Sequence, residues 1–270
     1  MFVDSHCHLT FPELHDRIGE IRTAMAAAGV DRALCICTTL EEFAKVHALA
    51  ATYENFWASV GVHPDNEGVT EPTVEALTAL SANTKVVAIG ETGLDYYRLN
   101  GRSVADMEWQ RNRFRVHIAA AKASQRPLIV HTRSASADTL SIMKEEGAAA
   151  PGGVFHCFTE TIDVARAALE LGFHISFSGI LTFRNAADLR DVARFVPLDR
   201  CLIETDSPYL APMPYRGKTN EPSLVPYVAR ALAETKGVEL EEIAQVTTAN
   251  FERLFKLDTS IEQPNAQVHH

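Results

Sequence analysis

Short apolar runs recur along the chain and alternate with segments that have helical periodicity. Each run is dense in Val, Ile, Cys or Phe, a composition typical of parallel strands that are buried on both faces. We expect eight strands, over residues 2–7, 32–38, 56–62, 86–90, 127–131, 153–158, 173–177 and 201–205.

Between these runs, apolar residues recur at the three- and four-residue spacing of amphipathic helices. Leu14, Ile18, Ile21 and Met25 predict one such helix, which Gly29 ends.

A second helix is expected to begin with Asn185 as its N-cap and to end before Pro197. It would bury Leu189, Val192 and Val196 on one face. Further helices are predicted over residues 104–124, 225–235 and 240–255.

The repeated order of strand and helix over about 250 residues predicts an α/β fold, a (β/α)8 TIM barrel. A doubly wound open sheet has the same alternation, but the chain lacks the Gly-rich dinucleotide-binding fingerprint that would favour it. We assign residues 1–257 to a single barrel domain and residues 258–270, which lack apolar periodicity, to a disordered tail.

Composition and charge limit what such a barrel can do. The chain has 270 residues, 46% of them hydrophobic, and a formal net charge of −10. An acidic protein does not attract nucleic acid through its overall field, so a phosphate substrate would need local positive charge, for example from bound metal ions. The odd number of cysteines, without zinc-ribbon spacing, predicts a reduced cytoplasmic protein. No pattern predicts a signal peptide or a membrane span.

Ionisable side chains mark the ends of six of the expected strands. In a (β/α)8 barrel the carboxyl ends of the strands meet at one face, where functional groups gather. We therefore expect these side chains to converge. They are His6 and His8, His63, Glu91, His131, His156 and Asp206.

Four histidines and two carboxylates of this set exceed the needs of one tetrahedral ion and suit two ions that share a bridging carboxylate. His6 and His8 face the same way, because side chains alternate along a strand. We assign His6, His8 and Asp206 to one ion, His131 and His156 to the other, and Glu91 to both as the bridge.

A second layer of residues is expected around these ligands. Asp4 and Glu204 each precede a ligand by two residues, so each should point inward and accept the second N–H of a metal-bound imidazole. His63 could bind metal or contact a substrate phosphate, and we favour the substrate because both ions already have ligands. His117 and His174 do not lie at strand C-ends, and we interpret them as structural.

Several basic and aromatic residues follow the strand ends. Arg and Lys suit phosphate oxygens and aromatic rings can stack on bases, although each residue could equally belong to a solvated loop surface. These residues are Tyr96, Tyr97, Arg98, Arg133, Arg184, Tyr209, Tyr215, Arg216 and Lys218. Together with His63, we select Tyr97, Arg133 and Arg216 as substrate-binding.

The motifs together resemble the TatD family of metal-dependent deoxyribonucleases, over residues 2–255. They are Asp4-Ser5-His6-Cys7-His8, Gly61-Val62-His63-Pro64, Gly90-Glu91-Thr92-Gly93-Leu94-Asp95, His131-Thr132-Arg133, His156-Cys157-Phe158, Glu204-Thr205-Asp206-Ser207-Pro208, Arg216-Gly217-Lys218, Asn220-Glu221-Pro222 and Thr248-Ala249-Asn250 with Leu254-Phe255. The resemblance implies a (β/α)8 barrel that binds divalent metals at the same six positions. It also implies hydrolysis of DNA phosphodiesters, often as a 3′→5′ exonuclease on single-stranded ends.

We therefore expect a hydrolase of ester bonds, a deoxyribonuclease whose two divalent ions (Mg²⁺, Mn²⁺ or Zn²⁺) activate water. Asp206 would accept the proton, and Glu91 would be the second catalytic carboxylate. The expected partner is single-stranded DNA as substrate, and no association with a membrane is expected. A monomer is favoured.

Two other functions compete with this one. An amidohydrolase that cleaves a C–N or ester bond, including D-aminoacyl-tRNA deacylation, would use the same ligands and stays open. Many binuclear amidohydrolases bridge their metals with a modified lysine, however, and this chain has Glu91. A non-catalytic metal-binding protein is disfavoured, because it would not need a proton acceptor such as Asp206 beside its ligands.

Overall fold

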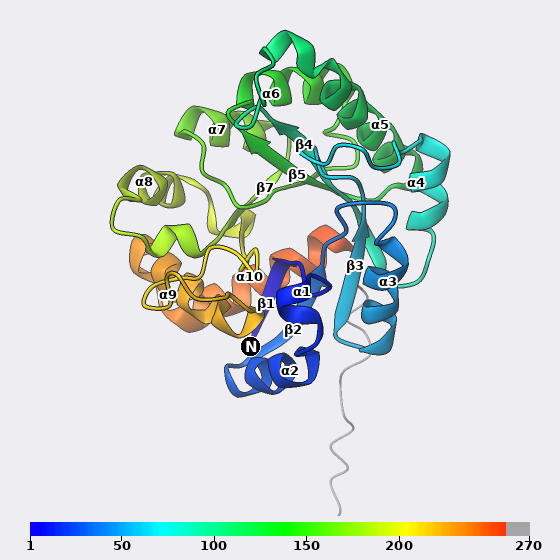
Figure 1. Ribbon diagram of the computed structural model, residues 1–270. Coiled ribbons are helices and arrows are strands. Elements are labelled where there is room, and N and C mark those ends of the chain that lie inside the picture. The colour runs from blue at the N-terminus through cyan, green and yellow to red at the C-terminus, as the bar shows by residue number, and fades with distance from the viewer. Residues whose placement is uncertain (258–270) are drawn as a thin grey trace, which may run out of the picture.

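The computed structural model describes residues 1–257, which form a (β/α)8 barrel (Figure 1). Its eight parallel strands pair in chain order, each with the next. They are β1 (Phe2–Cys7), β2 (Val30–Cys35), β3 (Phe56–Val60), β4 (Val86–Asp95), β5 (Leu128–Arg133), β6 (Gly153–Phe155), β7 (His174–Phe177) and β8 (Cys201–Ile203). The expected tail, residues 258–270, lies outside the described residues.

Helices surround the ring of strands and connect one strand to the next (Figure 1). They are α1 (Pro12–His15), α2 (Ile18–Ala27), α3 (Phe43–Thr52), α4 (Val74–Ser81), α5 (Glu108–Ser124), α6 (Ser136–Glu145), α7 (Ile162–Glu170), α8 (Ala187–Phe195), α9 (Val225–Lys236) and α10 (Leu240–Phe255). Short 3₁₀ segments are η1 (Val104–Met107), η2 (Gly179–Thr182), η3 (Leu198–Arg200) and η4 (Pro222–Leu224). Within the described chain, no helix has the length and apolar character needed to cross a bilayer.

The ring closes between β1 and β8 at their carboxyl ends. Cys7 and Ser207 form an isolated parallel bridge, and the backbone N–H of His8 donates to the Ser207 carbonyl at 2.8 Å. The backbone N–H of Asp206 donates to the His6 carbonyl at 2.9 Å. Closure of the barrel therefore places two of the expected ligand segments side by side.

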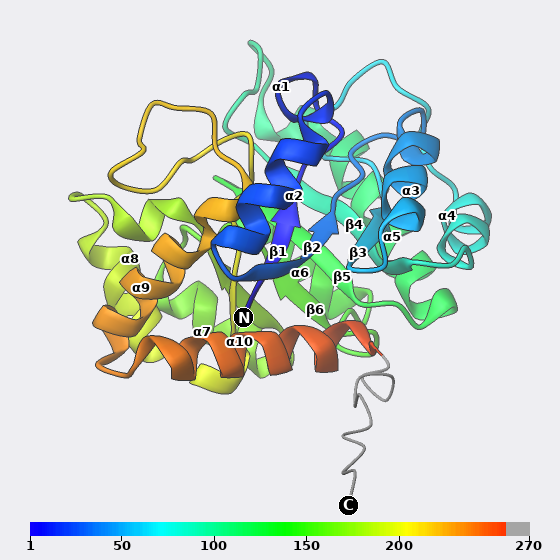
Figure 2. The same cartoon turned by 90° about the horizontal axis from the view of Figure 1, so that it is seen from below.

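Two apolar cores hold the barrel together, one between strands and helices and a smaller one inside the ring. In the smaller core, Phe251 and Phe255 of α10 pack with strand residues such as Val3 and Leu202. Figure 2 shows α10 lying across one end of the barrel, while α1 stands at the other end. The end where the strands terminate is thus left open for chemistry.

Three local expectations are wrong. The first helix is split into α1 and α2, because Arg17 leaves the helical region at φ −111° and ψ 14° while Leu14 and Ile18 stay buried on both sides of the break. Residues 104–124 likewise form η1 and then α5. The N-cap of α8 is Ala186, not Asn185, and it makes no side-chain capping bond.

Candidate metal centre

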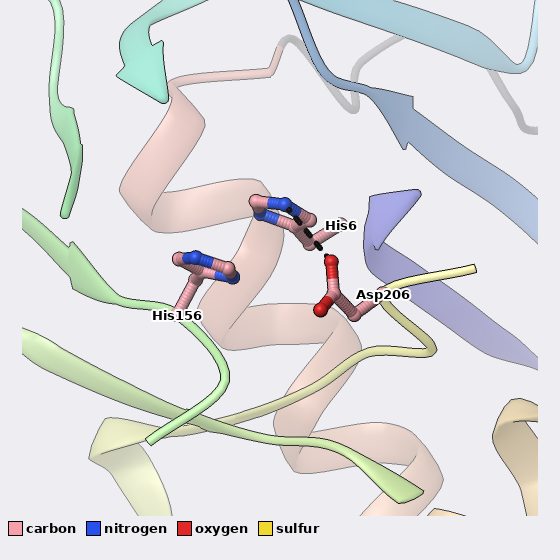
Figure 3. Close-up of side chains that lie close together, drawn as sticks. All are labelled: His6, His156 and Asp206. Atoms are coloured by element: carbon pink, nitrogen blue, oxygen red, sulfur yellow. Dashed lines mark ion pairs between the residues drawn. The ribbon is translucent and has the colours of Figure 1, made fainter. Parts of the chain in front are cut away.

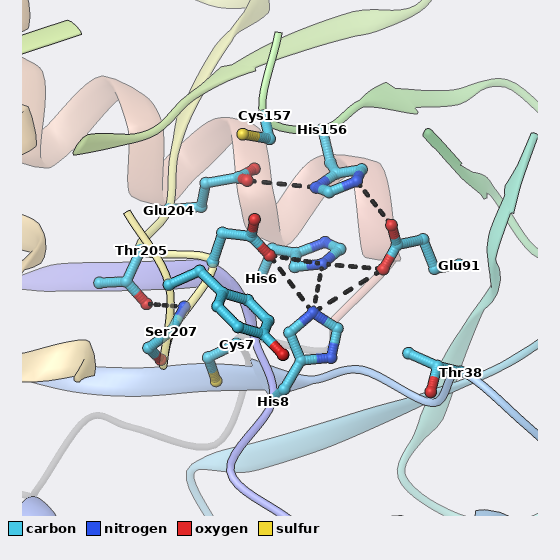
Figure 4. A network of polar contacts seen from close by, with 12 residues as sticks. His6, Cys7, His8, Thr38, Glu91, His156, Cys157, Glu204, Thr205 and Ser207 are labelled. Atoms are coloured by element: carbon cyan, nitrogen blue, oxygen red, sulfur yellow. Dashed lines mark hydrogen bonds and ion pairs between the residues drawn. The ribbon is translucent and has the colours of Figure 1, made fainter. Parts of the chain in front are cut away.

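All six expected ligands converge at the open end of the barrel. Glu91 lies on β4 and His131 on β5, while His156 and Asp206 come shortly after β6 and β8. Figure 3 shows Asp206 and His156 on either side of His6, and Figure 4 shows Glu91 and His8 facing the same point. Residues distant in the chain are therefore brought together here.

The Glu91 carboxylate lies at the middle of the cluster and divides the histidines into two sets. Its Oε2 faces His6 Nε2 at 3.3 Å and His8 Nε2 at 3.8 Å. Its Oε1 faces His156 Nε2 at 2.8 Å, His131 Nδ1 at 3.2 Å and His63 Nε2 at 3.2 Å. Each oxygen thus has its own imidazole set.

The charge of Glu91 is fixed by these neighbours. Burial raises the pKa of its carboxyl, but His156, His63 and His6 outweigh that effect and hold the pKa well below its usual range. Glu91 is therefore ionised at neutral pH, although its side chain is only 2% exposed.

Asp206 completes the set on the Oε2 side. Its Oδ1 lies 3.3 Å from His8 Nε2 and 3.6 Å from His6 Nε2. Burial raises the pKa of Asp206, but the hydrogen bond to His8 and the charge of His6 lower it overall. With a side chain that is 15% exposed, it is the more accessible of the two carboxylates. An ionised, accessible carboxylate can accept a proton from a nearby water.

These donor atoms fit divalent cations. Three groups of nitrogen and oxygen atoms each lie within 4.8 Å of one another: His6 with His156 and Asp206, His6 with His8 and Glu91, and His63 with Glu91 and His131. The His6 and His156 rings stack at 3.8 Å, so protonating both would place two positive charges in contact. Imidazoles that offer lone pairs beside ionised carboxylates are a donor set for Zn, Mn, Fe or Co, and Mg can take oxygen-rich positions.

A close approach of backbones sets the position of Glu91. A side chain on Gly61 would place its Cβ 2.5 Å from the Gly90 carbonyl carbon, and one on Gly93 would lie 1.9 Å from the His131 carbonyl oxygen. Only glycine allows β3, β4 and β5 to approach so closely beside the cluster.

Two carboxylates orient histidines of the Oε1 set. Glu204 Oε1 lies 3.2 Å from His156 Nδ1, which leaves Nε2 facing Glu91. Asp95 Oδ2 lies 3.0 Å from His131 Nε2, which leaves Nδ1 facing Glu91. Asp95 was not among the site residues expected from the sequence. The signal was available, because Asp95 follows Glu91 by four residues on β4 and alternation puts both on one face.

The expected role of Asp4 is wrong. Its Oδ1 accepts hydrogen bonds from the backbone of Thr205 at 2.9 Å and of His6 at 3.2 Å, and its Oδ2 accepts from Thr205 Oγ1 at 2.5 Å. Asp4 therefore ties the ends of β1 and β8 together instead of orienting an imidazole. The two-residue spacing from His6 predicts the direction of the Asp4 side chain, but it does not predict that its partner is Thr205, at the junction of β1 and β8.

His63 lies among the donor atoms, because its Nε2 is 3.2 Å from Glu91 Oε1 and it forms one of the three possible metal-binding groups with Glu91 and His131. Buried Arg113, which the sequence analysis missed, donates to the carbonyls of His63 and Asn66, both at 2.8 Å. His117 Nε2 accepts from the Val62 backbone at 2.9 Å, and burial lowers the pKa of His117 to about 4. Both residues hold the end of β3 in place, the structural role expected of His117.

Comparison with known proteins identifies the family of the chain. The family model of TatD related DNase matches residues 3–256. The chain belongs to this family. The uncharacterized metal-dependent hydrolase YcfH of Escherichia coli K12 is 50% identical over 262 residues, which cover 96% of this chain and 97% of that protein. The 3′-5′ ssDNA/RNA exonuclease TatD of Citrobacter rodentium is 34% identical over 251 residues, covering 91% and 93%.

A solved structure agrees with these relatives. The crystal structure of YjjV, a TatD homolog from Escherichia coli K12, matches with a TM-score of 0.87 at 30% identity, covering 95% of this chain and 98% of that one. The protein is therefore a TatD-family metal-dependent hydrolase with a TIM-barrel fold.

The expected substrate contacts of this TatD-family hydrolase lie in different surroundings. The Arg133 guanidinium stacks over the Tyr97 ring at 3.6 Å, and Tyr97 is 61% exposed, so this pair is open to a ligand. Arg216 is exposed and stacks over Phe183 at 4.5 Å. Tyr96, by contrast, is buried and donates its hydroxyl to Asp138 at 2.7 Å, which turns it away from substrate.

Proposed function

We propose that the protein hydrolyses DNA phosphodiesters as a 3′→5′ exonuclease on single-stranded ends, with two divalent cations held by the cluster. The observation that carries this proposal is the division of ligands around Glu91. One carboxylate oxygen faces His6 and His8, and the other faces His131 and His156. Such a bridged pair of sites suits in-line displacement at phosphorus.

The cluster would hold one ion with His6, His8 and Asp206 and the other with His131 and His156, bridged by Glu91. Ions bound there would lower the pKa of a water molecule and neutralise charge on the phosphoryl oxygens. The chain's own contribution is to hold these donors in a buried frame and to keep an accessible carboxylate, Asp206, as the proton acceptor.

Substrate contacts would come from the rim around this frame. The exposed Arg133–Tyr97 pair presents a cation and a ring beside His131, where a phosphate and a terminal base could be held. The Citrobacter relative is a 3′-5′ ssDNA/RNA exonuclease by name, which supports the same class of substrate.

The test combines metal analysis of the purified protein with hydrolysis of single-stranded DNA labelled at either end. We expect nucleotides to be released from the 3′ end, and release to stop on chelation. Asp206→Asn should lower kcat by about 100-fold or more, the usual effect of removing a proton acceptor. Glu91→Ala should abolish hydrolysis and remain folded by circular dichroism, because its role is to hold the ions.

Cyclic amides, lactones and D-aminoacyl-tRNA are tested as substrates in parallel, because the competing function is hydrolysis of a C–N or ester bond. Hydrolysis of one of these, with no nucleotide released from DNA, would overturn the nuclease proposal. Unfolding of Glu91→Ala under conditions where wild type is folded would instead mark the cluster as structural.

A further inference from the structure

We propose that a strip of cation–aromatic pairs beside the loop after β8 binds the single-stranded nucleic acid that leads away from the metal centre. The proposal rests on the proposed function and adds a second binding site to it. The strip, called here the cation–aromatic strip, consists of Arg216 over Phe183, Lys218 over Tyr215 and Arg230 over Tyr227.

Two of the three pairs are in contact, and the third is joined to them through the chain, because Arg216 directly follows Tyr215. Their cations lie 4.5, 5.8 and 5.5 Å from the centroids of the rings beneath them. The Tyr215 and Tyr227 rings meet edge to face at 5.1 Å, and their hydroxyls lie 3.1 Å apart. The strip thus runs from the rim of the barrel down onto α9.

The charge of the strip is not neutralised locally. Among residues 1–257, no ion pair with a carboxylate is formed by Arg216, Lys218 or Arg230, and all three side chains are exposed. The protein as a whole carries a net charge of −10, so these cations stand out against an acidic molecule. A polyanion would therefore be attracted to this side of the rim and not to the molecule at large.

A groove continues the strip between α8 and α9. It has a volume of about 610 Å³, and its lining includes Met213, Tyr227 and Arg230. Its other arginines already have partners: Arg190 donates to backbone carbonyls, and Arg194 pairs with Asp191. Glu234 also lines the groove, but no ion pair joins it to Arg230 among the described residues, so Arg230 is the cation there that can meet a phosphate.

The loop after β8 connects the groove to the metal centre. From Asp206 the loop reaches Met213 in seven residues, so the groove starts within about 25 Å of the cluster. Tyr209 and Met213 along this loop are 53% and 41% exposed. Figure 2 shows the loop at the end of the barrel that also carries α1, above α8 and α9. A single strand of about ten nucleotides is long enough to span this path.

The chemistry of the strip suits a single strand better than a duplex. Stacked bases are accommodated by aromatic rings without sequence preference, and each contact is worth roughly a fivefold or larger change in affinity. Arginine and lysine over those rings meet the phosphates and add a salt-dependent component. The strip would thus hold the 5′ part of the strand while its 3′ end lies at Glu91.

The test measures binding of fluorescent single strands of 4 and 16 nucleotides to the metal-loaded protein by anisotropy, with non-hydrolysable linkages in the strands so that nothing is cleaved. Lys218→Ala/Arg230→Ala should weaken binding of the longer strand about tenfold and leave the shorter strand within twofold. The slope of log affinity against log salt should fall by about 1.4, which is about 0.7 for each lost phosphate contact. Tyr227→Leu should weaken binding of the longer strand without changing this slope. Tyr227→Phe, which keeps the ring, should bind the longer strand as wild type does.

The control removes the same charge elsewhere. Lys144→Ala/Arg166→Ala takes away an exposed cation of α6 and another cation–aromatic pair, Arg166 over Phe195 at 4.8 Å. Equal weakening by the control and the strip variant would overturn the proposal, as would wild-type binding that does not increase with strand length. Binding is measured without cleavage, so the two proposals can fail separately. If the protein cleaves DNA but fails this test, only the strip proposal is refuted. If it binds through the strip but cleaves nothing, only the nuclease proposal is refuted.

Discussion

Asp95 gives the sharpest test of how the centre is built, because its two oxygens have different partners. Oδ2 faces His131 Nε2 at 3.0 Å, and Oδ1 accepts from the Tyr97 backbone N–H at 2.9 Å. Burial raises the pKa of Asp95, but His131 lowers it overall, so the group is ionised and only accepts. In a metal-bound His131 the ring proton would therefore lie on Nε2, and the lone pair of Nδ1 would be available to the ion beside Glu91.

Replacing Asp95 by Asn should reverse this arrangement. If the amide oxygen keeps the Tyr97 bond, the amide NH₂ meets His131 Nε2, and the histidine proton must move to Nδ1, where it blocks a metal. If the amide turns over, the NH₂ opposes the Tyr97 N–H. The first outcome removes the Nδ1 lone pair that would bind the ion, and the second leaves a donor facing a donor. Each costs about 1–3 kcal/mol, which corresponds to about 5- to 150-fold. We therefore expect a loss of about 10- to 100-fold in metal affinity and in kcat.

Glu204→Gln is the matched control for this experiment. Glu204 Oε1 faces His156 Nδ1, but its Oε2 has no hydrogen-bond partner among the described residues. A glutamine there can turn its oxygen toward His156 and keep the same tautomer, so the effect should be much smaller. Calorimetric metal titration, kcat and thermal unfolding are measured for both variants. Equal losses would show that charge matters and not the tautomer, and an Asp95→Asn protein with wild-type metal affinity would refute the reasoning.

Two further predictions concern stability. Phe251→Ala should lower the free energy of unfolding by about 3–5 kcal/mol in chemical denaturation, because it empties the ring-filling core; a loss under 1 kcal/mol would show that α10 does not close the barrel. His117 has its pKa lowered from 6.5 to about 4 in the folded protein, so its contribution is present above pH 6.5 and is lost as the pH falls toward 4. Between pH 7 and 4, the free energy of unfolding of His117→Gln should therefore fall by about 3 kcal/mol less than that of wild type. Identical slopes of unfolding free energy against pH in the two proteins would contradict a neutral buried histidine.

The order and type of the elements could be predicted from the sequence, because buried parallel strands and amphipathic helices have distinct periods. The bounds could not be predicted as well. The expected strand 86–90 extends to Asp95 as β4, since the pairing with β5 continues past Glu91 through Gly93 and His131. Apolar spacing also does not report a break in the backbone, as the non-helical conformation of Arg17 shows.

The convergence of the cluster could be predicted because a barrel brings all strand ends to one face. What could not be predicted is which partner each polar group finds across the ring. Glu204 is close in sequence to Asp206 but orients His156 from another strand, and Asp4 binds Thr205 and not an imidazole. Sequence spacing fixes the direction of a side chain along its own strand, whereas the stagger between strands decides what it meets.

The two ligand sets differ in how firmly they are held, and this difference has a measurable consequence. Asp95 and Glu204 fix the rings of His131 and His156, whereas Nδ1 of His6 and of His8 has no hydrogen-bond partner among the described residues. Rings that are already oriented lose less freedom when an ion binds, so the Oε1 set should fill at lower metal concentration. Calorimetric titration of the metal-free protein should then show two steps, with Asp95→Asn weakening the tighter one and Asp206→Asn the weaker one. If Asp206→Asn removed the tighter step instead, the order of filling would be set by charge and not by the support behind each imidazole.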